Sequence, residues 1–150
     1  MKRVVPQFLS EMNGVTSRDD GQQALLFVGA TNEPWNIDEA AMRPGRFDEK
    51  VYVALPNKQA RFTIIKDLVA KIPGASGIDC SSIAAALEGY SGADIVHVIE
   101  RAKQSAFADS IHRGAARDLA LSDIEQAIPQ VRPSVSGKML DRYSAFLRDP

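Results

Sequence analysis

The stretch that decides the fold runs Ala24-Leu-Leu-Phe-Val-Gly-Ala-Thr-Asn32 and continues Glu33-Pro-Trp-Asn-Ile-Asp-Glu-Ala-Ala-Met-Arg43-Pro-Gly-Arg46-Phe-Asp48. Leu25 to Val28 is a continuous apolar run too short for a helix, which is typical of a strand covered on both faces. Asn32 would then follow the carboxyl end of a strand, where open α/β sheets place their ligands. The stretch therefore predicts a buried strand that delivers a polar residue to a site.

A short helix is expected after this strand. Asn36 and Glu39 have the spacing of a capping box, and Pro44-Gly45 stops the helix. Arg43 and Arg46 flank the stop and are permanently charged forks suited to phosphate. Taken singly, each of these residues could equally be structural, with Asn32 bonding its own turn and the arginines solvated.

The ordered set Ala-Thr-Asn-x-Pro-x-x-Ile-Asp-x-Ala-x-x-Arg-Pro-Gly-Arg-Phe-Asp resembles the second region of homology of the AAA ATPases. The resemblance implies that Asn32 is the sensor that positions water near the γ-phosphate of ATP. It also implies that Arg43 and Arg46 reach across a subunit interface to the ATP of a neighbour, in a hexamer.

Composition indicates an ordinary globular chain. Its 150 residues are 45% hydrophobic and 25% charged, with a net charge of −1, so bulk charge gives no reason to expect a nucleic-acid or membrane partner. Cys80 is the single cysteine, which excludes an internal disulfide and favours a reducing compartment. Without a signal peptide or a membrane-spanning run, the sequence predicts a cytoplasmic protein.

The first residues predict a helix. Val4, Val5, Phe8, Leu9 and Met12 form a helical stripe that ends at Asn13-Gly14, similar to the AAA helix after the Walker B strand. The loop that follows contains Asp19-Asp20, which we interpret as solvated carboxylates, and no metal site is expected.

A second strand is expected at Glu49 to Leu55, where Val51, Val53 and Leu55 alternate. Beyond Pro56 the pattern becomes helical. The predicted fold is thus α/β followed by all-α: residues 1–56 as the C-terminal part of a P-loop AAA parallel sheet, and residues 57–150 as a helical AAA lid with a C-terminal helix.

Four caps are expected in the helical half. They are Asn57, Asp79, Ser91 with Asp94, and Ser122 with Glu125. The helix after Ser91 carries an apolar stripe of Ile95, Val98, Ile99, Ala102, Ala106 and Ile111. A last helix places Tyr143, Phe146 and Leu147 together, either against the chain's own body or as anchors for a partner.

Gly89-Tyr-Ser-Gly-Ala-Asp94 resembles the AAA lid loop whose backbone contacts adenine, which would assign Gly92 and Ala93 to nucleotide binding beside their role at a helix start. Leu68 stands where family members often carry a nucleotide-contacting histidine. The segment from Arg132 to Phe146 is similar to the end of the unfoldase branch typified by valosin-containing protein, and also to the katanin and spastin branch.

A phosphate-binding loop of the form Gly-x-x-x-x-Gly-Lys-[Ser/Thr] is absent from the sequence, as is a strand ending in Asp-Glu that would hold Mg²⁺. The resemblance therefore covers the C-terminal part of an AAA module. It implies ATP or ADP with Mg²⁺ in the complete module, a protein substrate unfolded or remodelled there, and little nucleotide binding or turnover by this segment alone.

Three alternatives stay open. The chain could be one half of a split ATPase, or a non-catalytic module that binds proteins through its lid and last helix. A membrane-bound AAA zinc protease has a similar arginine motif, but the His-Glu-x-x-His metal site of that class is not present in this sequence.

Overall fold

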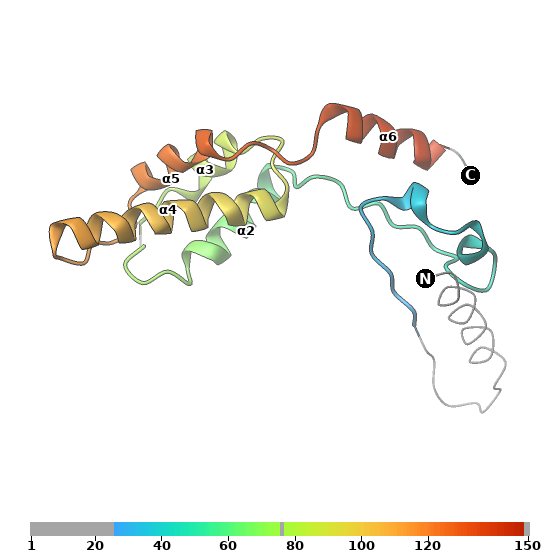
Figure 1. Ribbon diagram of the computed structural model, residues 1–150, viewed down its shortest axis with the longest axis horizontal. Coiled ribbons are helices and arrows are strands. Elements are labelled where there is room, and N and C mark those ends of the chain that lie inside the picture. The colour runs from blue at the N-terminus through green and yellow to red at the C-terminus, as the bar shows by residue number, and fades with distance from the viewer. Residues whose placement is uncertain (1–25, 76, 149–150) are drawn as a thin grey trace, which may run out of the picture. The chain divides into compact units, whose positions relative to one another are not determined.

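The computed structural model describes residues 26–75 and 77–148. The expected N-terminal helix of residues 1–15, the loop with Asp19 and Asp20, and Leu25 lie outside the described residues. The chain separates into two compact units, Met1–Val53 with Ala145–Pro150 and Ala54–Ser144. Each unit is described by itself below (Figure 1).

The first unit contains short 3-10 helices where a helix was expected. They are η1, Pro34–Asn36, and η2, Glu39–Met42 (Figure 1). The predicted Asn36 cap is wrong, because Asp38 caps η2 by accepting a hydrogen bond from the Ala40 amide at 2.9 Å. Asn36 instead donates to Glu33. Ala41 is buried here among a small apolar cluster of Phe27, Ile37, Ala40 and Phe47.

No strand forms among the described residues, so the strands expected to include residues 26–28 and 51–55 are not seen there. Leu26, Val28, Val51 and Val53 are each 81–86% exposed. A strand bonds its backbone to neighbouring strands, and the described chain supplies no such ladder, so these segments stay irregular. The described fold is helical.

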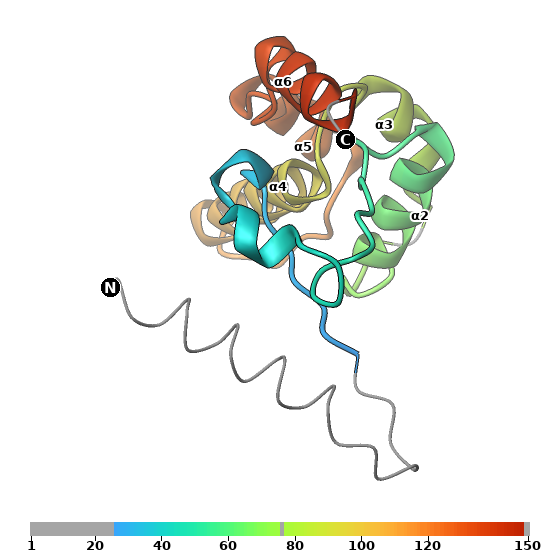
Figure 2. The same cartoon turned by 90° about the vertical axis from the view of Figure 1, so that its right-hand side faces the viewer.

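The second unit holds the helices that the sequence predicts, with bounds as follows: α2 Lys58–Val69, α3 Cys80–Ala86, α4 Gly92–Arg113, α5 Leu121–Ala127, η3 Ile128–Gln130 and the first part of α6 Gly137–Arg148. α2 packs on α3 and α4, and α4 packs on α5, as the views along two directions show (Figure 1, Figure 2). Within the described ranges, no helix is long and apolar enough to cross a bilayer.

Most of the predicted caps are confirmed. Asn57 accepts from Ala60 at 2.9 Å, Asp79 accepts from Ser81 at 2.9 Å, and Ser91 with Asp94 forms a capping box. The Ser122 cap is wrong: α5 begins at Leu121 with Ala120 in the cap position, two residues earlier than expected, and the Asp123 carboxylate accepts from the Ala120 amide at 2.9 Å. The Asp123 carboxylate also pairs with Arg117, which fixes its position at the start of α5.

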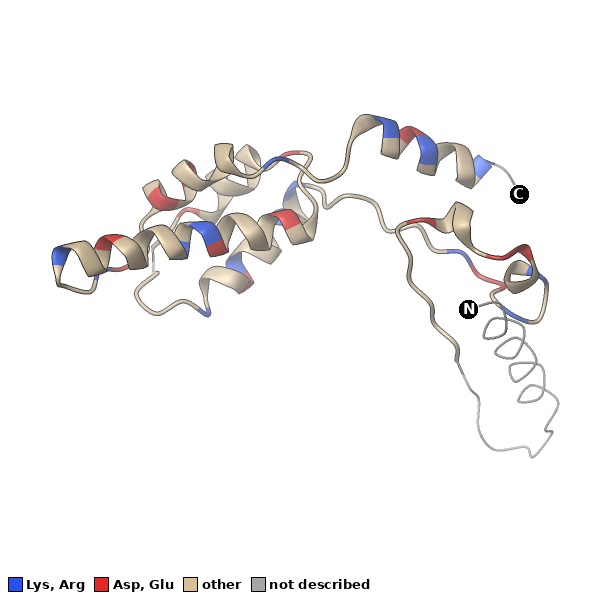
Figure 3. Ribbon diagram, viewed as in Figure 1, with Lys and Arg blue, Asp and Glu red and all other residues tan. Residues whose placement is uncertain are grey.

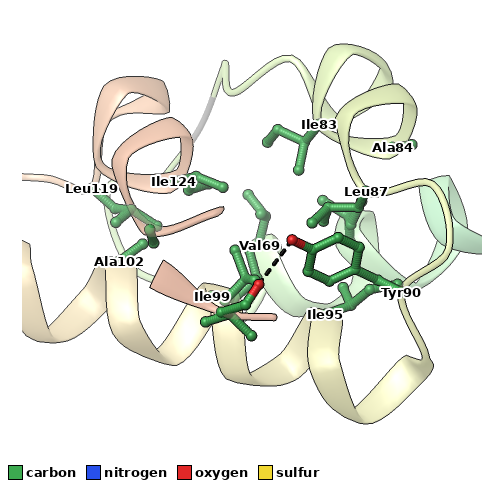
Figure 4. Packing of buried hydrophobic residues seen from close by; sticks show 14 of the residues in the cluster. Val69, Ile83, Ala84, Leu87, Tyr90, Ile95, Ile99, Ala102, Leu119 and Ile124 are labelled. Carbon is green, nitrogen blue, oxygen red and sulfur yellow. Dashed lines mark hydrogen bonds between the residues drawn. The ribbon is translucent and has the colours of Figure 1, made fainter. Parts of the chain in front are cut away.

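The core of this unit lies where α2, α3, α4 and α5 meet. Ile83, Leu87, Ile95, Ile99 and Ile124 are at most 2% exposed and converge there (Figure 4). The predicted α4 stripe is buried from Ile95 to Ala106, but Ile111 is 64% exposed. Tyr90 adds a polar tie, because its hydroxyl donates to the Val131 carbonyl at 2.8 Å.

An ion pair links α5 to the chain before it. Arg117 donates to both oxygens of Asp123 at 2.7 and 2.8 Å and also pairs with Asp109. This bidentate contact with Arg117 lowers the pKa of Asp123, although burial acts in the opposite direction. Both acidic and basic residues occur along α4 (Figure 3).

The Asp123 contact predicts a pH dependence of stability. A carboxyl group whose folded pKa is depressed stabilises the fold fully above its unfolded pKa of about 3.9, and this contribution is lost as pH falls through the folded pKa. We expect Asp123→Asn to lower the urea midpoint of the chain at pH 7 and to have progressively less effect as the pH approaches 2. Glu125→Gln, on the exposed side of α5, is the control. A difference between Asp123→Asn and the parent chain that does not change between pH 7 and pH 2 would contradict this account.

Candidate nucleotide-facing elements

The Arg43 and Arg46 turn is a compact structure in the first unit. Gly45 takes a φ of +83°, and its amide donates to the Asp48 carboxylate at 2.7 Å. The Phe47 amide donates to the Ala41 carbonyl at 3.2 Å, which closes the chain back on η2. The positive φ at Gly45 explains why glycine follows proline at this turn.

The two arginines of this turn differ in their surroundings. Arg43 follows directly on η2 and its side chain is exposed. Arg46 is half-buried, and its guanidinium donates to the Ala40 carbonyl, one of the backbone acceptors that a short helix leaves at its end. Arg43 thus projects towards solvent, whereas Arg46 also braces the turn.

Asn32, the predicted sensor, lies in an exposed segment between residues 26–28 and η1. Its neighbour Thr31 accepts a hydrogen bond from the Glu33 amide at 3.0 Å through its hydroxyl, so the Thr-Asn pair enters a local turn. Asn32 belongs to the same unit as the arginine turn, whereas Gly92 and Ala93 belong to the second unit.

Gly92 and Ala93 open α4, where backbone amides of the first turn have no helical partner. The Ser91 hydroxyl accepts from the Asp94 amide at 3.2 Å, and the Asp94 carboxylate accepts from the Ser91 amide at 2.9 Å. Gly92 is half-buried and Ala93 is exposed. A side chain added at Gly92 would meet its nearest neighbour, the Ile64 δ-carbon, at 4.0 Å, so packing alone does not require glycine there.

The Asp94 carboxylate accepts further hydrogen bonds beyond its capping contact. One of its oxygens also accepts from the amide and the hydroxyl of Ser134, at 3.1 and 3.0 Å. Burial by itself would raise the pKa of Asp94, but the hydrogen bonds from Ser91 and Ser134 outweigh burial and lower it. The sequence predicted the cap but not the bond to Ser134, which lies forty positions further along the chain.

Arg61 was also missed by the sequence analysis. It is 7% exposed, and its guanidinium donates to the carbonyls of Ala84 at 2.8 Å and Pro56 at 2.9 Å. Leu68, which replaces the expected histidine, packs against the helical core. Across the described ranges, His, Cys, Asp and Glu side chains do not gather in any group that could hold a metal ion.

Comparison with known proteins identifies a family. Residues 1–55 match the family described as "ATPase family associated with various cellular activities (AAA)". The chain belongs to the AAA ATPase family.

Within that family the chain is 32% identical, over 99% of its length, to the cell division cycle protein 48 homolog of Archaeoglobus fulgidus. It spans about a fifth of that protein, 21% of its length. The similarity extends through the helical unit, beyond the residues matched by the family model.

Proposed function

We propose that this chain acts as the C-terminal part of an AAA ATPase module that hydrolyses ATP with Mg²⁺ to unfold or remodel proteins. The observation that carries the proposal is the arginine turn, with exposed Arg43 directly after η2 and Gly45 holding the bend. An exposed guanidinium on a braced turn is suited to reaching a phosphate outside its own unit. The similarity to the archaeal homolog supports the same reading.

In this proposal Asn32 positions the attacking water at the chain's own ATP, and Arg43 and Arg46 contact the ATP of a neighbouring copy. Gly92 and Ala93 lie against adenine, where the small residues and the free amides of the α4 start allow close approach. The segments at residues 1–56 and 57–150 act as sheet part and lid, in a cytoplasmic homo-hexamer. Magnesium and most phosphate contacts come from a phosphate-binding loop and an acidic strand end that this sequence lacks.

The exposed apolar residues of the first unit support the proposal that this unit is part of a sheet completed by other residues. Leu26, Val28, Val51 and Val53 are each more than 80% exposed, which costs stability unless other chain covers them. We call the assembly that supplies this cover together with the phosphate-binding loop the assembled ATPase. It is either one longer polypeptide or, in the split form, a complex with a second chain.

The purified chain alone should therefore show no ATP turnover. Without a phosphate-binding loop it has neither the amide cradle nor the lysine that hold the β- and γ-phosphates. Phosphate release should equal the buffer background with and without Mg²⁺, and light scattering should show a particle size that ATP does not change. Turnover that requires Mg²⁺, or a ring that forms with ATP, would contradict the proposal.

A protein-binding module without catalysis is the second candidate. Phe107 and Ile111 lie one turn apart on α4 and are 69% and 64% exposed, a pair that favours contact with another protein. The candidates separate in the assembled ATPase: if replacing Arg43 and Arg46 together with alanine leaves hydrolysis unchanged, the binding module is the better description.

A further inference from the structure

Two hydrogen-bonded ties join the loop before α4 to the segment after α5, and both flank Gly92 and Ala93. The first is the Asp94 oxygen that receives four hydrogen bonds, from the amides and hydroxyls of Ser91 and Ser134, at 2.7–3.1 Å. The second is the buried Tyr90 hydroxyl on the Val131 carbonyl at 2.8 Å. The loop is thus held from both sides by residues 131–134.

Capping explains only part of this arrangement. Ser91 satisfies the requirement of the α4 start for a cap, and Asp94 needs no partner beyond Ser91 to complete the capping box. The Ser134 bonds add a long-range connection, because Ser134 stands shortly before Ser136, whose hydroxyl accepts from the Met139 amide at the start of α6. The Ser134 bonds therefore connect Asp94 to the chain that leads into α6.

We propose that Asp94 and Ser134 form a latch that positions Gly92 and Ala93, the first residues of α4, for the nucleotide and couples them to the segment leading into α6. This inference rests on the proposed function for its ligand, ADP or ATP. Asp94 and Ser134 are positioning residues: the nucleotide touches the backbone of Gly92 and Ala93, and the latch fixes where that backbone lies.

The test uses ADP with a fluorescent ribose label and the assembled ATPase. Ser134→Asp places a second carboxylate against Asp94, and like charges at this distance repel, so we expect the Kd for ADP to rise about tenfold. Ser134→Ala removes the hydroxyl donor and keeps the hydrogen bond from the backbone amide of residue 134 to Asp94. It should raise the Kd about threefold. Ser136→Asp is the matched control, because it adds the same charge two positions away at a helix cap that accepts aspartate, and should change the Kd less than twofold.

A rescue separates the latch from general damage to the fold. Asp94→Asn removes the negative charge but keeps an oxygen acceptor, so Ser134→Asp should have little further effect in the Asp94→Asn background. If the double variant still binds ADP about tenfold more weakly than Asp94→Asn alone, or if Ser136→Asp weakens binding as much as Ser134→Asp, the latch is wrong.

The coupling should also be visible without substitutions, since linkage between two sites is reciprocal. ADP should slow hydrogen exchange at the Ser134 amide, which donates to Asp94, by about the factor by which Ser134→Asp weakens ADP binding. Unchanged exchange at Ser134 when ADP saturates the protein would overturn the proposal.

Gly92→Val distinguishes a failure of the latch from a failure of the proposed function. There is space for a side chain at Gly92, so this variant should fold and yet obstruct adenine. If Gly92→Val leaves the Kd for ADP unchanged, the assignment of the nucleotide to this loop is wrong and the latch falls with it. If Gly92→Val weakens binding and Ser134→Asp does not, the latch alone is wrong.

Discussion

Replacing Arg43 with alanine in the assembled ATPase should lower kcat by about 10³-fold or more, while the Kd for ATP changes little. An arginine supplied to a neighbour's ATP stabilises charge that develops on the transferring phosphoryl group, an effect worth roughly 10³–10⁵ in rate in related nucleotidases. The position of Arg43 suits this role, because it is exposed and leaves η2 on a turn fixed by Gly45. The measurement is steady-state phosphate release at saturating ATP.

Two further variants sharpen the Arg43 prediction. Arg43→Lys should recover only part of the rate, because an ammonium cannot form the paired contact of a guanidinium with phosphate oxygens. Arg113→Ala is the matched control: Arg113 is an exposed arginine paired with Asp109 on the surface of α4, and its loss should leave kcat within about twofold. A kcat for Arg43→Ala equal to that of Arg113→Ala would contradict the trans-acting role.

Mixing experiments test whether Arg43 acts on the neighbour. The Arg43→Ala protein is mixed with a variant whose phosphate-binding lysine is replaced and which therefore cannot hydrolyse its own ATP. Some interfaces of the mixed assembly then join an intact arginine to an intact nucleotide site. These interfaces should restore activity. Activity that stays at the level of the two separate variants would place the arginine in its own subunit's site. This result would leave the AAA assignment in place and correct the residue's role.

Arg61→Ala should strongly destabilise the helical unit. The guanidinium is 7% exposed and satisfies the carbonyls of Ala84 and Pro56. Its removal leaves a space and takes a donor from the buried Ala84 carbonyl and from the partly buried Pro56 carbonyl. A buried acceptor left without a donor costs about 1–3 kcal/mol. We expect the free energy of unfolding to fall by about 3 kcal/mol and Tm to fall by about 10 °C or more. Circular dichroism of the purified chain during unfolding measures both quantities.

The reason for the large Arg61 effect can be tested with two companions. Arg61→Met keeps most of the side-chain volume and lacks the donors, so the part of the loss that it reproduces belongs to the hydrogen bonds. Lys66→Ala changes an exposed cation on the same helix and should cost less than about 0.5 kcal/mol. Equal unfolding free energies for Arg61→Ala and Lys66→Ala would show that the Arg61 hydrogen bonds contribute nothing to stability.

Local signals predicted the helical half well. Asn57, Asp79 and Ser91 with Asp94 cap their helices as the spacing indicated, because a cap is decided within the three or four residues that form it. The stripe from Ile95 to Ala106 is buried because its period matches a helix with partners on one side. Ile111 departs from this period, because nine residues at about 100° each place it on the opposite side of α4 from Ala102, and it is exposed.

The sheet part was not predictable in the same way. The apolar run at residues 25–28 and the alternation at residues 51–55 describe what strands would need around them, namely neighbours on both sides and cover on their faces. Among the described residues these neighbours are not supplied, and the segments stay irregular with exposed valines. The sequence pattern thus indicates that these segments need neighbouring strands and cover, which other parts of the assembly would have to supply.

The sequence by itself determined the family, the helix positions and the candidate residues Asn32, Arg43, Arg46, Gly92 and Ala93, because motif order and helical spacing are local properties of the chain. Tertiary structure alone decided that Arg61 is buried against Ala84 and that Ser134 meets Asp94. These contacts join segments whose separation along the chain carries no signal in the sequence. A hydrogen bond between such segments depends on how helices pack, and packing is set by the whole core rather than by any single stretch.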